Sequence, residues 1–192
     1  LQDDNGKMLT PYKYDFMSEP EQQGVVVKSR EKTGFINAEG KEITGFKYHN
    51  ANFAFVNDLS KVYCRKKETK SDTELTTKWG LIDVHGNEIY PLKCKKIIRS
   101  GGNFIIQVNN KYGLLDKKGN ICTKIEFDDI KETNDKLFIA QLDNKYGLLD
   151  TTGKYVIETK FIRITNWDSK FYLCHNENKT FLCHLILYVF IY

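Results

Sequence analysis

The sequence has few residues that break or loosen a chain. Among 192 residues there are only three prolines, and no stretch is rich in serine and glycine. A long flexible linker is therefore not expected. No window of about a dozen residues combines a sustained 3.6-residue period with capping residues, so no helix is predicted. Tyrosine (11) and phenylalanine (12) are abundant, and this balance favours strands.

Arginine and closely spaced cysteines are also scarce. The net charge of +4 comes almost entirely from lysine, and a protein that reads bases usually relies on arginine. We therefore do not expect a nucleic-acid partner. None of the five cysteines has CxxC spacing. The pairs Cys174-His175 and Cys183-His184 are nine residues apart, and neighbours on a strand face opposite sides. We predict no metal site and no cofactor.

Catalytic motifs are missing as well. The sequence has no GxSxG, no HExxH, no phosphate loop and no GxGxxG, and its four histidines are scattered. We therefore expect a protein that is not an enzyme. No transmembrane segment is predicted, because the longest apolar stretch, residues 181–192, is shorter than the roughly 20 residues that a spanning helix needs.

What the sequence does contain is an internal repeat. Lys78-Trp79-Gly80-Leu81-Ile82-Asp83 returns as Lys111-Tyr112-Gly113-Leu114-Leu115-Asp116 and as Lys145-Tyr146-Gly147-Leu148-Leu149-Asp150, with a weaker copy from Lys32 to Asn37. The leading glycines are Gly34, Gly80, Gly113 and Gly147. A second glycine follows six residues later, at Gly40, Gly86, Gly119 and Gly153. Such recurrence is typical of an array of stacked units.

The spacing divides the chain into units of about 34 residues. We place these units near 1–33, 34–79, 80–112, 113–146 and 147–180, and expect the chain to begin inside a truncated copy. Two places break the pattern. The second unit carries extra residues around 66–77, interpreted as a longer hairpin loop that either binds a partner or is a tolerated insertion. Residues 181–192 form an atypical hydrophobic tail, which is a closing strand, a truncated segment or out-of-frame translation.

Each unit is predicted to be a three-stranded meander. Between residues 138 and 161, for example, the strands are expected at 138–142, 146–150 and 155–161, with polar turns at 143–145 and 151–154. The second glycine lies where a turn needs positive φ, and the leading glycine implies close approach of another backbone or ring. The predicted fold is an all-β tandem array of hairpin repeats, open and solenoid-like or partly closed like a propeller, in which neighbouring units stack.

These residues resemble the WG-repeat family, also called the KWG repeat, whose pattern is Lys-Trp/Tyr-Gly-aliphatic-Ile-Asp followed by Gly-Lys and a Lys-Tyr-Asp ending. The resemblance covers about residues 1–180 and is strongest at Lys78–Asp83, with Gly86, Ile89 and Pro91. It implies a binding or interaction module, often on a bacterial surface or secreted, and it brings no catalytic residue. The localisation is otherwise unknown.

Two columns of residues recur in register and are the candidate binding residues. Lys78, Lys111 and Lys145 either form a track for an anionic polymer or are solvated turn residues that protect strand edges. Trp79, Tyr112 and Tyr146 either stack on sugar rings or pack on neighbouring units. The repeated Asp83, Asp116 and Asp150 are interpreted as structural, since such side chains bind nearby backbone amides.

The cysteines are interpreted as core residues. The repeat aligns Cys64 and Cys174 with Val27, Ile106 and Ala140, places Cys94 in an aromatic position and places Cys122 in an aliphatic one. The leading hypothesis is a non-catalytic module for protein–protein interaction or scaffolding. The alternative is a carbohydrate or cell-envelope glycan binder that uses the Trp79/Tyr112/Tyr146 ladder.

Overall fold

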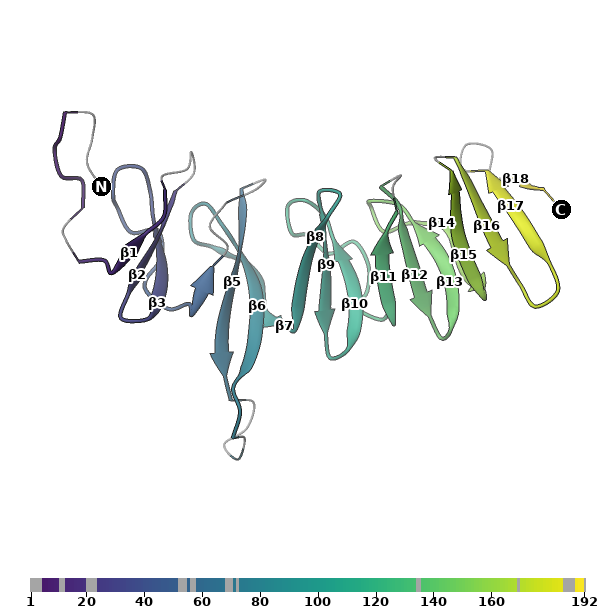
Figure 1. The fold of residues 1–192 in the computed structure, drawn as a ribbon, viewed down its shortest axis with the longest axis horizontal. Coiled ribbons are helices and arrows are strands. Elements are labelled where there is room, and N and C mark those ends of the chain that lie inside the picture. Colours follow the sequence, from purple (N-terminus) through teal and green to yellow (C-terminus); the bar gives the residue numbers. More distant parts are fainter. Residues whose placement is uncertain are drawn as a thin grey trace. The chain divides into compact units, whose positions relative to one another are not determined.

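The computed structural model describes residues 5–10, 13–19, 24–51, 55, 58–67, 71, 73–133, 136–168, 170–184 and 189–191. This part of the chain contains eighteen β-strands and no helix (Figure 1). The all-β prediction is therefore confirmed. The chain divides into two compact units, Leu1–Ile97 and Ile98–Tyr192, which are described separately.

The first unit contains two antiparallel sheets. Their orders are β1-β2-β3 and β4-β5-β6-β7. The strands are β1 (Phe16–Met17), β2 (Val25–Ser29), β3 (Lys32–Ile36), β4 (Asn50–Ala51), β5 (Leu59–Lys66), β6 (Thr76–Asp83) and β7 (Glu88–Cys94).

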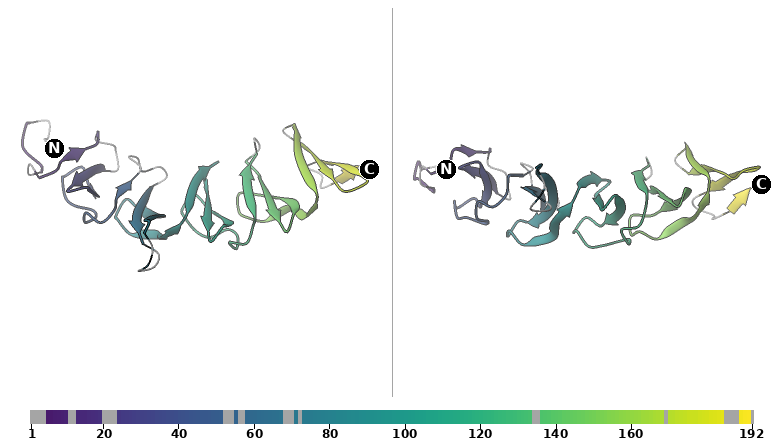
Figure 2. Two further views of the ribbon diagram at one scale, coloured as in Figure 1. Left: turned by 60° about the horizontal axis from the view of Figure 1, so that its bottom comes forward. Right: turned by 90° about the horizontal axis from the view of Figure 1, so that it is seen from below.

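The second unit contains three antiparallel sheets, and the first strand of the first sheet starts just before the boundary. The sheet orders are β8-β9-β10, β11-β12-β13-β14 and β15-β16-β17-β18. The strands are β8 (Lys96–Ser100), β9 (Asn103–Val108), β10 (Lys111–Leu115), β11 (Asp129–Glu132), β12 (Phe138–Leu142), β13 (Lys145–Leu149), β14 (Tyr155–Phe161), β15 (Arg163–Asp168), β16 (Phe171–His175), β17 (Thr180–His184) and β18 (Val189–Ile191). Figure 2 shows the sheets of each unit following one another in chain order.

The predicted meander is present, and the structure adds a strand to it. Strands β12, β13 and β14 match the three predicted strands, and β11 pairs with the outer edge of β12. The sequence Asp-Ile-Lys-Glu of β11 gave no strand signal, because it is four residues long and buries only Ile130. Backbone pairing to a neighbour, rather than its own composition, makes this segment a strand.

The sheets do not coincide with the sequence units. The predicted unit that starts at Gly147 supplies β14 and most of β13 to one sheet, and then β15 and β16 to the next. The units near 34–79, 80–112, 113–146 and 147–180 are each divided in this way between two successive sheets. The sheets are continuous antiparallel meanders, whereas the recurring sequence motif begins in the middle of one.

Short hairpins between the central strands explain part of the repeat. Arg30-Glu31, Asn109-Asn110 and Asp143-Asn144 all have positive φ and join the second and third strands of their sheets. Two consecutive residues with positive φ are the signature of a type I′ turn, whose twist matches that of the flanking strands. Asparagine and aspartate tolerate this conformation better than most residues.

The insertion lengthens one hairpin. Strands β5 and β6 have eight residues each and pair as far as Lys66 with Thr76, so part of the expected loop is strand. Residues 68–70 and 72 lie outside the described part. The insertion also shifted one sequence alignment: Val62, not Cys64, faces Gly80, and Cys64 faces Lys78. The predicted equivalence of Cys64 with Val27, Ile106 and Ala140 was wrong, whereas Cys174 does occupy that position.

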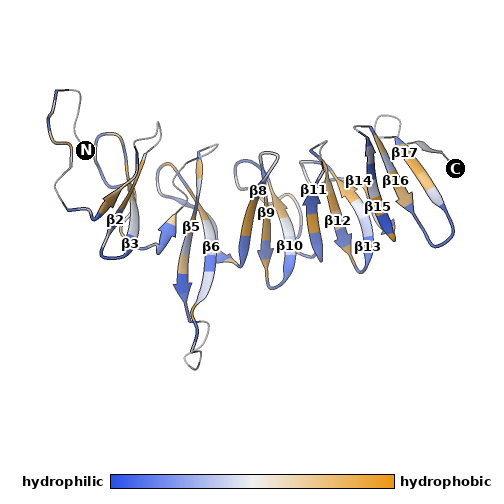
Figure 3. Cartoon of the chain, in the orientation of Figure 1, coloured by the Kyte–Doolittle hydropathy of each residue, from blue (hydrophilic) through white to orange (hydrophobic). Residues whose placement is uncertain are grey.

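The hydrophobic cores lie between successive sheets within each of the two compact units. In the second unit, Ile105 and Leu114 from one sheet pack with Phe138, Ala140 and Leu149 from the next. In the first unit, residues of β2 and β3 pack with residues of β5 and β6 in the same way. The hydrophobic residues, orange in Figure 3, concentrate on the strands. A single sheet would leave one apolar face in water, so the neighbouring sheets stabilise each other.

The predicted tail is partly strand. Residues 181–184 belong to β17, which pairs along its length with β16, and β18 pairs with β17. Residues 185–188 and 192 lie outside the described part. Within that part, no helix has the length and hydrophobicity of a membrane-spanning segment.

Candidate functional site

The leading glycine of each copy lies beneath the segment that crosses over it. A Cβ atom on Gly147 would lie 2.6 Å from the Ile157 carbonyl oxygen, and one on Gly80 would lie 2.7 Å from that of Tyr90. On Gly113 the nearest atom would be a side-chain carbon of Ile125 at 3.0 Å. At Gly147 and Gly80 the backbone therefore excludes a side chain. At Gly113 a side chain would only be crowded.

A threonine distinguishes the looser copies. The Thr44 hydroxyl accepts a hydrogen bond from the Phe35 amide (3.0 Å), and that of Thr123 accepts one from the Leu114 amide (2.9 Å). In these two copies the segments around Thr44 and Thr123 make isolated β-bridges and do not form continuous strands. At the equivalent position Tyr90 and Ile157 lie within β7 and β14. We call these two kinds the threonine copies and the apolar copies.

The second glycine sits in a turn that presses on the preceding copy. Gly40, Gly86, Gly119 and Gly153 have φ between 78° and 85°. A Cβ atom on Gly153 would lie 2.6 Å from the Cys122 carbonyl oxygen and 2.8 Å from the Thr123 methyl group. Positive φ and close contact both require glycine at this position. Thr123 therefore has two contacts: its hydroxyl accepts a hydrogen bond from the Leu114 amide, and its methyl group packs near Gly153.

The recurring aspartates organise these turns. Oδ1 of Asp116 accepts hydrogen bonds from the amides of Lys118 (2.8 Å) and Asn120 (2.9 Å), and Oδ2 accepts one from the Asn120 side chain (2.8 Å). Asp83 makes the same three contacts with His85 and Asn87. Partial burial raises the pKa of the Asp116 carboxyl, but the hydrogen bonds from Asn120 and Lys118 outweigh it and leave the pKa below its usual value. These carboxylates are used within the fold.

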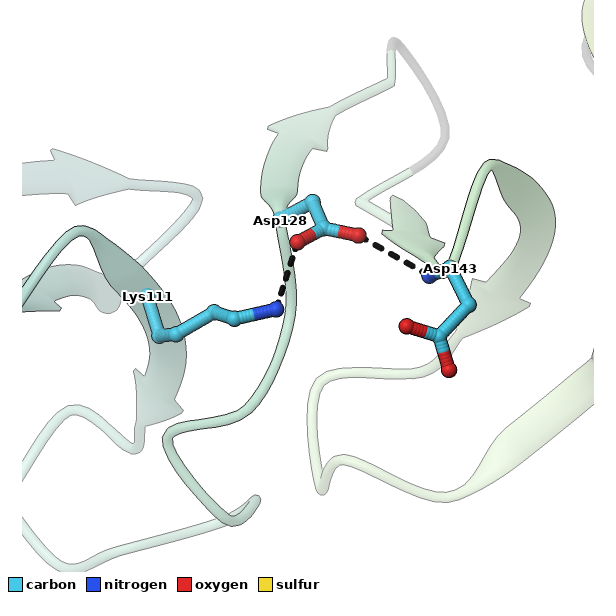
Figure 4. Close-up of polar contacts among 3 residues, drawn as sticks. All are labelled: Lys111, Asp128 and Asp143. Atoms are coloured by element: carbon cyan, nitrogen blue, oxygen red, sulfur yellow. Dashed lines mark hydrogen bonds and ion pairs between the residues drawn. The ribbon is translucent and has the colours of Figure 1, made fainter.

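The lysine column is partly occupied by internal partners. Lys111 Nζ lies 2.5 Å from Asp128 Oδ1, and the other carboxylate oxygen accepts a hydrogen bond from the Asp143 amide at 2.9 Å (Figure 4). The contact with Lys111 lowers the pKa of Asp128. In the first unit His49 replaces the aspartate. Its ring lies 3.0 Å from Lys32 Nζ and accepts a hydrogen bond from the Arg65 amide at 3.1 Å.

Lys145 differs from Lys111. Ile162 stands where the preceding copy has Asp128, and Lys145 borders an open hollow of about 420 Å³ next to the β16–β17 turn. Within the described residues Lys145 makes no ion pair. Lys78 lies in β6 opposite Cys64 and does have a polar or electrostatic partner. The three lysines therefore do not form one uniform track.

The repeat has a counterpart among known families. The model of the WG-containing repeat matches residues 34–67, 79–112, 112–146 and 146–173, which together exceed half of the chain. The chain belongs to the WG-containing repeat family.

Comparisons with individual proteins add little to the WG-repeat assignment. No curated protein matches the chain. A structure described as the eukaryotic initiation factor has 9% identity and a TM-score of 0.42, over 95% of this chain and 57% of that one. AztD from Citrobacter koseri has 11% identity and a TM-score of 0.39, over 95% and 59%. The WG-repeat chain thus spans less than two thirds of either structure, and neither similarity supports a functional argument.

The aromatic ladder of the WG repeats is half-buried. Tyr112 and Tyr146 pack against the cores between sheets. Trp79 packs against Tyr63, with 4.7 Å between ring centroids. The rings therefore have packing partners in the fold, and each leaves part of its surface exposed.

The cysteines lie mostly in the interior. Cys64, Cys94, Cys174 and Cys183 are buried, and Cys122 is partly buried. Burial raises the pKa of the Cys94 thiol to about 12. Cys183 donates a hydrogen bond to Cys174, with 3.1 Å between the sulfurs, and this contact together with burial raises the pKa of Cys174. Within the described residues, no group of three or more His, Cys, Asp or Glu side chains is arranged to hold a metal ion.

Sequence reasoning missed a surface on the long hairpin. Lys61 Nζ lies 5.7 Å from the Trp79 ring centre, and the Arg65 guanidinium lies 6.0 Å from that of Tyr63. Because Trp79 and Tyr63 face each other across β5 and β6, cations and rings alternate along one face. We call Lys61, Trp79, Tyr63 and Arg65 the hairpin face. Its signal was hidden by the misaligned insertion, which placed Tyr63 two positions out of register.

Proposed function

We propose that this WG-repeat chain is a non-catalytic module that binds another protein, with the β5–β6 hairpin as its main contact. The hairpin face carries the proposal. Tyrosine, tryptophan and arginine are the residues most enriched at the energetic centres of protein interfaces. Here one of each lies side by side on a rigid pair of strands.

The shape of the hairpin supports the same conclusion. Its strands are three residues longer than those of the β2–β3 and β12–β13 hairpins. The additional length carries exposed Arg65, Lys66 and Lys67, and Leu75 is 55% exposed at the far end. The distal part of β5 is hydrophilic, blue in Figure 3. An extended hairpin with an apolar residue near its tip and cations along one strand suits a partner with acidic and apolar residues.

Glycan binding is the weaker alternative. Sugar recognition through the ladder would need the exposed faces of Trp79, Tyr112 and Tyr146. Tyr63 covers one part of Trp79, and the other two rings pack on the cores. No catalytic role is proposed, because the recurring carboxylates already bind turn amides.

Photocrosslinking tests the proposal. A photoreactive amino acid at position 75, exposed to an extract of the source organism, should capture one or a few proteins. The same group at Ile121, which is 66% exposed in the other unit, is the matched control. Capture at position 75 should be lost in Trp79→Ala and Arg65→Glu. Equal capture at both positions, or capture that survives both substitutions, would contradict the proposal.

Fluorescence separates the glycan alternative. Trp167→Phe leaves Trp79 as the only tryptophan, because the chain contains two. In that background, soluble cell-wall fragments should leave the emission of Trp79 unchanged. A saturable shift with a glycan, together with no crosslinked protein, would favour sugar binding instead.

A further inference from the structure

The contacts of Asp128 show how the fold itself binds a carboxylate at this position of the repeat. Its carboxylate joins two donors that belong to different hairpins, the ammonium of Lys111 and the backbone amide of Asp143 (Figure 4). In the first unit, Asp15 accepts a hydrogen bond from the Arg30 amide at 2.7 Å. His49 connects Lys32 with the Arg65 amide in the same way. In these three copies the residue after the aromatic ending acts as an acceptor for a hairpin, whereas the copy that begins at Gly80 has Lys95 at this position.

The next copy keeps the two donor groups, at Lys145 and Glu177, but has Ile162 in place of the acceptor. Ile162 follows the aromatic ending Phe161 and is 40% exposed. Lys145 corresponds to Lys111. Glu177 corresponds to Asp143 in strand register, because His175 pairs with Thr180 as Gln141 pairs with Tyr146, although Glu177 lacks the positive φ of Asp143. Within the described part of the chain, neither the ammonium of Lys145 nor the amide of Glu177 has a hydrogen-bond partner.

A hollow of about 420 Å³ lies at this position. Lys145 and Lys179 border it together with Ile162, Phe181 and the turn residues 176–178. Two ammonium groups against the single carboxylate of Glu177 leave an excess of positive charge. The side chains of Ile162 and Phe181 add apolar surface beside the cations.

We propose that this hollow binds a carboxylate carried on a short apolar stem, as in a glutamate side chain. One oxygen accepts from Lys145 Nζ and the other from the Glu177 amide, so the ligand has the bridging role that the Asp128 carboxylate has one copy earlier. Hydrogen bonds from an ammonium group or a backbone amide to a carboxylate are stronger than those between neutral groups. The site lies in the second unit and does not depend on the hairpin face.

Two probes distinguish the possible sources of the carboxylate. Propionate represents a free small acid, and a peptide with blocked ends and a single glutamate represents a protein side chain. Each is titrated into the ¹⁵N-labelled chain, and the amide signals of residues 176–179 are followed. Saturable shifts are expected with the glutamate peptide and not with its glutamine counterpart. Shifts with propionate as well would assign recognition to the carboxylate alone, and shifts with the peptide only would assign it to a peptide-borne side chain.

Variants identify the donors. Lys145→Gln should weaken binding about two- to fivefold, the size expected for loss of an exposed charge pair. Lys111→Gln is the matched control and should leave it unchanged. Ile162→Asp should abolish binding, because it supplies an internal carboxylate. Asp128→Ala should create a second site, seen as ligand-dependent shifts at residues 143 and 144.

The proposal has clear failing outcomes. Absence of shifts with both probes would overturn it, as would equal shifts with the glutamine peptide. Binding that persists in Lys145→Gln and in Ile162→Asp would also overturn it. None of these results bears on crosslinking at the hairpin, so the two proposals fail independently.

Discussion

The threonine copies and the apolar copies solve the same packing problem differently. In the apolar copies a continuous strand, β7 or β14, lies directly over the leading glycine. In the threonine copies a hydroxyl takes the hydrogen bond of the strand amide, and the crossing backbone lies farther from the glycine. One position in the repeat, four residues after the turn glycine, thus decides how closely two segments approach.

The difference shows that identical sequence motifs need not tolerate the same substitution of their glycine equally well. Lys-Tyr-Gly-Leu-Leu-Asp occurs in both kinds of copy, beginning at Lys111 and at Lys145. A Cβ atom on Gly147 would meet backbone atoms at 2.6–2.9 Å, whereas on Gly113 the nearest atom belongs to the Ile125 side chain and the nearest backbone atoms lie at 3.3 Å. Backbone cannot move without breaking hydrogen bonds, whereas a side chain can change rotamer.

The largest expected effect breaks an apolar copy. Gly147→Ala would place Cβ within 3 Å of three backbone atoms of β14, so we expect a loss of about 3 kcal/mol in unfolding free energy. Gly113→Ala, in a threonine copy, should cost about 1 kcal/mol or less, because Ile125 can adjust. Urea unfolding followed by circular dichroism measures both. Equal losses would show that the two kinds of copy do not differ in this way.

The turn glycine should show the second-largest effect. Gly153→Ala combines a φ of 82° with contacts on Cys122 and Thr123, and we expect a loss of about 2 kcal/mol. Gly6 has a similar φ of 76°, and among the described residues no atom lies within 4 Å of the position that a Cβ atom would take there. Gly6→Ala should therefore cost about 1 kcal/mol from strain alone. The difference between the two unfolding midpoints isolates contact from strain. If Gly6→Ala is as damaging, strain alone explains both.

The threonine itself provides a smaller test. Thr123→Val keeps the methyl group that contacts Gly153 and removes the acceptor of the Leu114 amide, so a loss of about 1 kcal/mol is expected. Thr159→Val, in β14 of an apolar copy, is the control and should change stability little. Hydrogen exchange at the Leu114 amide should also become faster in Thr123→Val. Unchanged exchange at that amide would mean that the hydroxyl is dispensable.

The turns that Asp116 and Asp150 organise should contribute equally to stability in the threonine copy and in the apolar copy. The pKa values of Asp116 and Asp150 are both lowered in the folded state. A lowered folded pKa stabilises the protein above the unfolded value near 4, and that stabilisation is lost as the pH falls through the folded pKa. Asp116→Asn and Asp150→Asn should each lose about 0.5 kcal/mol at pH 7 and nothing at low pH. Unequal losses at pH 7, measured by urea unfolding, would reveal a difference between the turns.

Much of the fold could be predicted from the recurring letters. Gly147, Gly153 and Asp150 each stand where local geometry demands one residue type, so the sequence reports the geometry directly. Strand β11 could not be found in this way, because the backbone of β12 induces it. The alignment of Cys64 failed because the insertion lengthens both strands, and a sequence shows only the total length.

The candidate site was less predictable for the same reason. Lysines in register suggested a track, yet Lys111 and Lys145 differ through Asp128 and Ile162, which lie 17 residues further along the chain. The repeat pattern does not say which residue fills the space beside a lysine. The hairpin face likewise depends on the pairing of Tyr63 with Trp79 across two strands.

The offset between sequence units and sheets bears on how such a chain changes during evolution. A duplicated copy brings the closing half of one sheet and the opening half of the next. Inserting or deleting a whole copy therefore leaves each sheet with both halves, wherever the event occurs. Recombination can alter the number of copies without exposing a new unpaired strand edge, and each additional copy adds another bridging position that can be closed by aspartate or left open for a ligand.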